Sequence, residues 1–213
     1  MMRTSIFKKI WIFDLDNTLH DAGYYIYPQI NRLMTAYIVK HLEVDFEMAT
    51  DLRQRYWEKY GATLIGLIKN HKIDPYHFLE ETHNFTLSRK HVSSLTRLRH
   101  ILRKIRGRKY IYSNAPHSYI KSVLRILRLS SLFLDVFSID NTNFNPKPSL
   151  RGFHTVLGKY RLNPARCVMV EDTLENLHTA KLMGMKTIWV SEGVGKPSWV
   201  DARISHIGNL IKQ

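Results

Sequence analysis

The chain has little of what a secreted or membrane protein needs. Its single cysteine, Cys167, cannot form an internal disulfide, which agrees with a reducing cytoplasm. No apolar run approaches the roughly 18 residues of a membrane-spanning helix. Only four apolar residues separate Lys9 from Asp14, too few for the core of a signal peptide. We therefore predict a cytoplasmic protein without a membrane partner.

Acidic residues are missing from one long segment. No Asp or Glu occurs between Thr82 and Leu134, where twelve Lys or Arg occur, and this segment carries most of the net charge of +14. A basic face can steer phosphorylated metabolites or nucleic acids. We favour the simpler interpretation of solvated helix faces, because the basic residues are not interleaved with exposed aromatics. The sequence thus argues against nucleic acid as a partner.

A glycine-rich phosphate loop is also absent. No stretch matches GxxxxGK[ST], which argues against a nucleoside-triphosphate switch. The length of 213 residues suffices for one core domain with a modest insertion. Hydrophobic periodicity is helical throughout residues 21–90 and alternates between helix and strand from residue 91 onward. The pattern predicts a parallel, three-layer α/β sheet with a helical insertion, its five strands at residues 10–13, 109–112, 134–139, 167–170 and 186–190.

Paired polar residues follow three of these strands. The pairs are Asp14 with Asp16, Ser113 with Asn114, and Glu171 with Asp172. In parallel sheets ligands bind at the carboxyl ends of the strands, so these side chains are expected at one rim. A polar turn explains any one pair alone, but three pairs favour a site. Carboxylates without His or Cys neighbours suit Mg²⁺.

A lysine in the irregular loop of residues 140–148 could supply positive charge to this rim. Judged alone, Lys147 is most simply a surface residue. Within an acidic rim, the same lysine would offset the charge of a phosphate group. The loop position leaves both interpretations open.

Four separated pieces of sequence resemble the motifs of the haloacid dehalogenase superfamily of phosphohydrolases. They are Asp14-Leu15-Asp16-Asn17-Thr18, Ser113-Asn114, Lys147-Pro148, and Glu171-Asp172-Thr173 with Asn176. The resemblance implies a Rossmann-like catalytic core in residues 1–20 and 91–213, with a C1-type helical cap domain inserted after the first strand in residues 21–90. Cap stretches 27–31, 56–64 and 77–83 are similar to the pyrimidine 5′-nucleotidase branch.

The resemblance also implies roles for the polar residues. Asp14 would be the nucleophile that forms an aspartyl phosphate, and Asp16 the general acid and base. Mg²⁺ would be held by Asp14, the backbone carbonyl of Asp16 and Asp172, with Glu171 helping directly or through water. The groups expected to contact the phosphate are Lys147, Ser113 and Asn114, and those expected to support the site are Thr18 and Asn176.

Specificity is expected to lie in the cap. Tyr60 and His83 are candidate substrate contacts, and His20 is another because it directly follows the catalytic loop. Tyr24 and Tyr56 could also stack on a base, although ordinary helix packing explains any one cap residue more simply.

The sequence therefore predicts a Mg²⁺-dependent phosphomonoesterase that acts on a small phosphorylated metabolite, with a pyrimidine nucleoside 5′-monophosphate as the expected substrate. Asp16 argues against dehalogenation, because dehalogenating members are expected to lack this residue. One alternative is a phosphatase or mutase acting on a phosphosugar. Another is an inactive fold that binds nucleic acid or another anionic partner. We expect a monomer or a homodimer.

Overall fold

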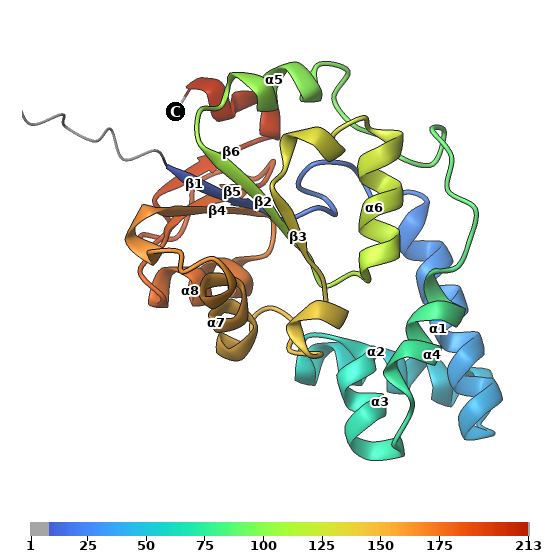
Figure 1. The fold of residues 1–213 in the computed structure, drawn as a ribbon. Helices are drawn as coiled ribbons and strands as arrows, with labels where there is room; N and C mark the ends of the chain where they lie inside the picture. Colours follow the sequence, from blue (N-terminus) through green and yellow to red (C-terminus); the bar gives the residue numbers. More distant parts are fainter. Residues whose placement is uncertain (1–8, 213) are drawn as a thin grey trace, which may run out of the picture.

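The computed structural model describes residues 9–212 and has an α/β architecture (Figure 1). The strands in this part of the chain are β1 (Ile10–Phe13), β2 (Arg108–Tyr112), β3 (Asp135–Phe137), β4 (Cys167–Glu171), β5 (Lys186–Val190) and β6 (Ala202–Ile204). The α-helices are α1 (Ile26–Leu42), α2 (Phe46–Tyr60), α3 (Thr63–His71), α4 (Pro75–His83), α5 (Leu98–Lys104), α6 (His117–Ile126), α7 (Leu150–Lys159) and α8 (Leu174–Leu182).

The strands form one parallel sheet in the order β3-β2-β1-β4-β5-β6. The direction of winding reverses between β1 and β4, which is where open α/β sheets bind their ligands. Phe13 pairs with Ile111 of β2 and with Val170 of β4. This register brings Asp14 and Glu171, the next residue of each strand, to the same edge of the sheet. The predicted Rossmann-like, three-layer core is confirmed.

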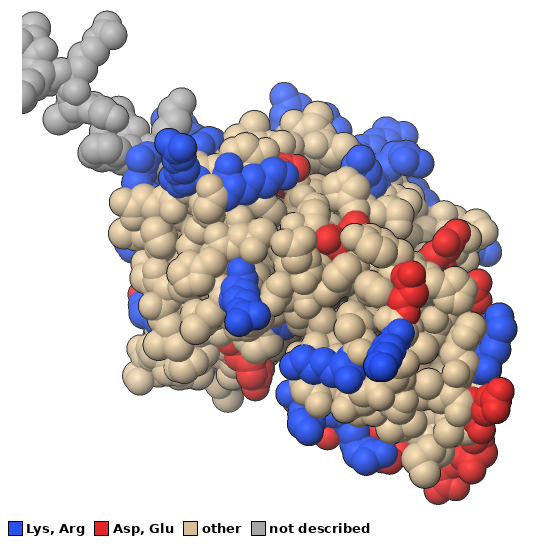
Figure 2. Space-filling view, turned by 60° about the horizontal axis from the view of Figure 1, so that its bottom comes forward, with Lys and Arg blue, Asp and Glu red and all other residues tan. Residues whose placement is uncertain are grey.

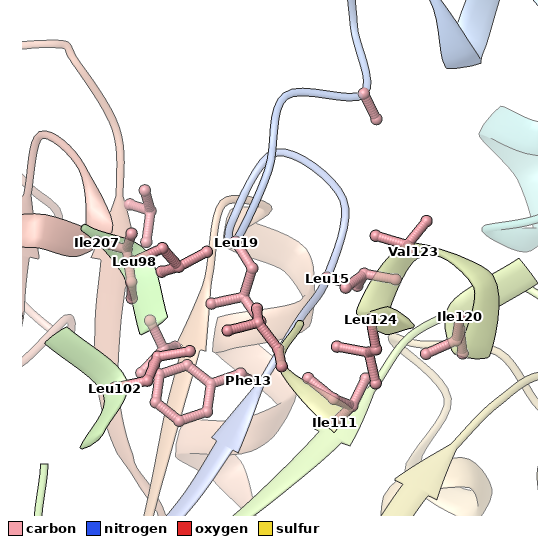
Figure 3. Close-up of a cluster of buried hydrophobic side chains, with 14 of the residues drawn as sticks. Phe13, Leu15, Leu19, Leu98, Leu102, Ile111, Ile120, Val123, Leu124 and Ile207 are labelled. Atoms are coloured by element: carbon pink, nitrogen blue, oxygen red, sulfur yellow. The ribbon is translucent and has the colours of Figure 1, made fainter. Parts of the chain in front are cut away.

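Alternating side chains of the strands build a hydrophobic core on each face. Phe13 and Ile111 pack against α5 and α6, in the cluster that also holds Leu102 and Val123 (Figure 3). Ile12, Tyr110 of β2 and Met169 of β4 pack against α7 and α8 on the other face. Burying each such large apolar side chain contributes about 2–3 kcal/mol, which makes the sheet a rigid base for the loops at its edge.

Helices α1 to α4 follow β1 and form the helical cap. They share a buried cluster that includes Ile38, Leu67 and Phe78. Asp45 and Asp74 accept hydrogen bonds from the first turns of α2 and α4, as N-cap residues do. The cap lies to one side of the sheet, away from β5 and β6 (Figure 1). The bounds given above for the insertion, residues 21–90, stay a prediction.

Two segments differ from the sequence prediction. The five-strand prediction missed β6, which pairs with β5 through Ile188 and Ala202. This strand has only three residues, too few for a readable period, and two of them are partly exposed. The loop of residues 140–148, predicted to be irregular, contains one 3₁₀ turn at Asp140–Thr142. Among the described residues, no helix combines the length and apolarity that a membrane crossing requires.

Candidate active site

The loop after β1 holds two carboxylates at the carboxyl edge of the sheet. The backbone N–H of Asp14 donates to the carbonyl of Val170 at 2.9 Å, which extends the strand pairing by one residue. Leu15 and Leu19 are buried in the cluster beside α6, and the N–H of Leu19 donates to the carbonyl of Leu15 (Figure 3). These two leucines anchor the loop, so the positions of Asp14 and Asp16 are fixed by the core.

Lys147 joins the carboxylates of two neighbouring strands. Its Nζ lies 2.6 Å from Oδ1 of Asp14 and 2.6 Å from Oε2 of Glu171, and all three side chains are buried. Burial alone lowers the pKa of Lys147, but the two carboxylates outweigh it and raise this pKa above its ordinary value. The lysine is therefore a fixed positive charge within the site and not a surface residue.

Asp172 adds a third carboxylate to this group. One oxygen each from Asp14, Glu171 and Asp172 lies within 4.8 Å of the other two. Burial, reinforced by the charge of Glu171, raises the pKa of Asp14 to about 7. Burial also raises the pKa of Glu171 to about 7 and that of Asp172 above its ordinary value. The single ammonium of Lys147 cannot balance three ionised carboxylates, so the oxygen donors and the excess negative charge fit a divalent cation such as Mg²⁺.

Asp16 lies in a different environment from Asp14. Its Oδ1 accepts a hydrogen bond from the hydroxyl of Tyr119 at 2.6 Å and lies 2.8 Å from Nε2 of His20. The imidazole of His20 is completely buried against Asp16. The structure thus places the His20 ring beside the predicted general acid, and its expected contact with substrate stays a prediction.

The residues after β2 hold the lysine loop. Oδ1 of Asn114 accepts from the N–H of Lys147 at 2.7 Å, and its Nδ2 donates to the carbonyl of Lys147 at 2.9 Å. Asn114 was expected to bind phosphate, and in the structure its side chain fixes the backbone of Lys147. One of its two Nδ2 hydrogens is left for another acceptor, such as a phosphate oxygen. The buried Ser113 accepts at Oγ from the N–H of Ala115, and its own hydroxyl hydrogen is available to a ligand.

Neighbouring groups orient the acidic residues of β4. The N–H groups of Asp172 and Thr173 both donate to Oε1 of Glu171 at 3.2 Å. Thr18 donates to Oδ1 of Asp172 at the long distance of 3.5 Å, and Trp189 donates to the carbonyl of Asp172 at 2.8 Å. The Thr18 contact agrees with its expected supporting role. The other expected support, Asn176, is buried in the first turn of α8.

The two cap candidates lie at different places. His83, at the end of α4, packs edge-on against Tyr119 with ring centroids 6.0 Å apart, and burial lowers its pKa to about 4. Tyr60, at the end of α2, lies beneath Nζ of Lys69 at 4.8 Å. A side-chain Cβ at the next residue, Gly61, would lie 3.1 Å from the carbonyl oxygen of Lys147, so this turn packs on the lysine loop.

Of the tyrosines considered for stacking on a base, Tyr24 contacts solvent and Tyr56 contacts another cap residue. Tyr24 is 90% exposed. The hydroxyl of Tyr56 lies 2.8 Å from Nε2 of His71 within the cap. A cleft of about 540 Å³ opens instead between α4 and α6, where His83, Tyr119 and Arg125 are among its lining residues.

Sequence reasoning missed Tyr119 and Trp189. Each lies within a pattern of apolar residues, next to Ile120 and Ile188 respectively. From such a pattern the sequence predicts only that their rings pack in the core. One signal for Tyr119 was available: it lies in the first turn of the helix that follows the Ser113 strand end. The hydroxyl of a tyrosine in that turn lies at the same edge of the sheet as the acids.

Comparison with known proteins agrees with this geometry. The family model described as haloacid dehalogenase-like hydrolase matches residues 11–190. The chain is 23% identical over 195 residues to Phosphate metabolism protein 8 of Saccharomyces cerevisiae, and the match covers 84% of this chain but only 60% of that relative.

Solved structures with the same fold include two enzymes of different activity. One is a HAD phosphatase from Thermococcus onnurineus, with a TM-score of 0.67, 18% identity and 96% of each chain covered. The other is L-2-haloacid dehalogenase from Xanthobacter autotrophicus, with a TM-score of 0.61, 16% identity, and 96% of this chain and 97% of that one covered. At these identities the structures establish a shared fold and no shared substrate.

Proposed function

Because the chain belongs to the haloacid dehalogenase-like hydrolase family, we propose that it is a Mg²⁺-dependent phosphomonoesterase that works through an aspartyl phosphate. The observation that carries this proposal is the contrast between two carboxyl groups at one strand end. Asp14 is buried against Lys147, whereas Asp16 is only partly buried and is held by Tyr119 and His20. The ammonium of Lys147 stabilises the ionised form of Asp14 that a nucleophile needs, and the hydrogen bonds to Asp16 hold it where it can transfer a proton.

In the proposed reaction, Asp14 attacks the phosphorus of the ester with Oδ2, since Lys147 holds its Oδ1. The ester P–O bond breaks as Asp16 donates a proton to the leaving oxygen. Asp16 then takes a proton from the water that attacks the aspartyl phosphate, which releases inorganic phosphate and restores Asp14. Lys147 offsets the charge of the phosphoryl oxygens throughout. When held by Asp14, Glu171, Asp172 and the carbonyl of Asp16, Mg²⁺ would add positive charge at these oxygens.

Leaving-group chemistry favours a phosphatase over a dehalogenase. A halide ion is a weak base and departs without a proton, so a dehalogenase has no need of a general acid at this step. An alkoxide departs only when it is protonated. Asp16 is fixed by two hydrogen bonds beside the nucleophile strand, and this supports chemistry in which the leaving oxygen takes up a proton.

For the substrate we propose a pyrimidine nucleoside 5′-monophosphate, with α1 to α4 acting as a C1-type cap. The cleft between α4 and α6 supports this choice, since its lining residue Tyr119 contacts Asp16, the group that faces the leaving alcohol. Its volume of about 540 Å³ lies within the range of small-molecule sites. His83 and Arg125 would offer hydrogen bonds to a base or sugar there. A phosphosugar, or transfer of the phosphoryl group to a sugar as in a mutase, is the alternative.

The covalent mechanism is tested with Asp14→Asn and a generic aryl phosphate. We expect phosphate release to fall at least about a thousandfold, because an amide is a poor nucleophile. Asp51→Asn is the matched control, since Asp51 lies on the exposed face of α2 and pairs with Arg55. Near-normal activity of Asp14→Asn would refute the mechanism. Release of phosphate from a panel of phosphorylated metabolites then identifies the substrate class.

A second candidate function is binding of a nucleic acid to the opposite edge of the sheet. The amino ends of β1 and β2 and the end of α5 carry exposed basic residues, namely Lys9, Arg103, Lys104, Arg106 and Arg108. Within the described part of the chain none of these five forms an ion pair. Lys and Arg side chains cover parts of the core surface in Figure 2.

Clustered arginines favour phosphate groups, which they bind with two hydrogen bonds. We therefore expect retention of a single-stranded oligonucleotide that weakens steeply between low and moderate salt. Charge reversal of Arg106 and Arg108 to glutamate should abolish this retention and leave phosphate release unchanged. Binding that is unaffected by the reversal would refute this second function.

A further inference from the structure

One oxygen of Asp16 carries two strong hydrogen-bond partners that come from different parts of the chain. Tyr119 reaches it from the first turn of α6 and donates at 2.6 Å. His20 reaches it from the end of the β1 loop at 2.8 Å. Both partners are buried, Tyr119 with 2% of its surface exposed and the side chain of His20 with none. Both contacts fall on Oδ1, and Oδ2 has no hydrogen-bond partner among residues 9–212.

We propose that Tyr119 and His20 are positioning residues that fix Asp16 so that Oδ2 faces the leaving oxygen of the substrate. This inference rests on the proposed phosphomonoesterase function. A carboxylic acid donates its proton from one oxygen, while the other oxygen accepts hydrogen bonds. The Tyr119 hydroxyl donates to Oδ1, and Nε2 of His20 also donates to Oδ1 when that nitrogen carries its hydrogen, so this arrangement assigns the carboxyl proton to Oδ2. They also stop rotation of the carboxyl group, which otherwise would have to be ordered during each turnover.

The cap supports this arrangement through Tyr119. The His83 ring of α4 packs edge-on against the Tyr119 ring, 6.0 Å between centroids, and both residues line the cleft between α4 and α6, where His83 is half-buried and Tyr119 is buried. Burial lowers the pKa of His83 to about 4, so this ring is neutral near pH 7 and packs as an uncharged group. Tyr119 thus lies between a cap residue and the general acid of the core.

The test compares two phosphate esters that need the general acid to different extents. The phenolate of 4-nitrophenyl phosphate departs with little help, whereas the alkoxide of benzyl phosphate must be protonated as it leaves. For Tyr119→Phe we expect kcat on benzyl phosphate to fall roughly 10- to 100-fold. We expect kcat on 4-nitrophenyl phosphate to fall less than about threefold, because nucleophilic attack by Asp14 is unaffected.

A matched control removes a tyrosine–aspartate hydrogen bond that lies outside the site. Tyr160 donates to Oδ2 of Asp135 at 3.0 Å on the protein surface, and Tyr160→Phe should leave both rates unchanged. His20 supplies a second, independent variant. His20→Leu should repeat the leaving-group effect, and His20→Gln, which keeps a side-chain N–H donor, should partly restore the rate on benzyl phosphate.

Coupling to Asp16 is measured with a double variant. In an Asp16→Asn background, Tyr119→Phe should cause no further change in the ratio of the two rates, because the group that it positions has lost its acid function. An equal fall on both esters, or a full additive effect in the Asp16→Asn background, would show that Tyr119 only supports the fold. If the wild-type protein hydrolyses neither ester, the phosphomonoesterase function itself fails and the inference falls with it.

Discussion

Mg²⁺ and protons are expected to compete for the same carboxyl groups, so the stabilisation of the protein by Mg²⁺ should depend on pH. Burial raises the pKa of Asp14 to about 7 and that of Glu171 to about 7. Between about pH 4 and 7 the folded chain holds protons that the unfolded chain releases, so the metal-free protein loses stability as pH rises. A bound divalent cation would remove this loss, because it stabilises the ionised carboxylates.

The expected magnitude follows from mass action. A metal present at 100 times its dissociation constant adds about 2.7 kcal/mol to the free energy of unfolding, and each tenfold loss of affinity removes about 1.4 kcal/mol. At about pH 5.5, one carboxyl with a pKa near 7 is protonated in all but a few per cent of molecules, which weakens metal binding roughly 30-fold. The increase in the free energy of unfolding caused by Mg²⁺ should therefore fall from about 2.7 kcal/mol at pH 8 to under about 1 kcal/mol at pH 5.5.

The measurement is the melting temperature with Mg²⁺ or with EDTA at the two pH values. For a chain of this size 1 kcal/mol corresponds to about 2–4 °C, so we expect a Mg²⁺ shift of roughly 5–10 °C at pH 8 and less than about 4 °C at pH 5.5. Asp172→Asn should abolish the shift at pH 8, whereas Asp51→Asn should retain it. Equal shifts at both pH values, or a full shift in Asp172→Asn, would refute this assignment of the metal ligands.

Three further substitutions test the fold and the site. Asn114→Ala removes both hydrogen bonds to the backbone of Lys147 and should lower kcat roughly 10- to 100-fold with a small change in melting temperature. Gly66→Ala would place a Cβ 2.2 Å from Cγ of Tyr56 between α2 and α3, and urea unfolding should show a loss of about 1–3 kcal/mol. Leu102→Ala, in the cluster of Figure 3, should cost about 2–5 kcal/mol by the same measurement, with activity per folded molecule preserved.

Residues at strand ends could be located from sequence because the chain itself fixes their position. An apolar strand followed by Asp14, and another followed by Glu171, must bring both acids to one edge once the strands are parallel. Lys147 was harder to place, since a loop residue has no periodicity. Its burial follows from the two hydrogen bonds to Asn114, a tertiary contact across 33 residues that no local pattern encodes. The strand β6 was missed because its three residues are too few to show a period.

The two halves of the site differ in how they depend on the cap. Lys147, Asp14 and Glu171 all belong to the core, and the cap contacts this group through the turn at Gly61, which packs on the backbone of Lys147. Asp16 is held by Tyr119, and the ring of Tyr119 packs against His83 of α4. Substitutions in the cap should therefore affect protonation of the leaving group more strongly than phosphoryl transfer to Asp14. Substitution of His83 by leucine, which keeps the packing volume, should accordingly change the ratio of rates on benzyl and 4-nitrophenyl phosphate less than Tyr119→Phe does, whereas His83→Ala should approach it.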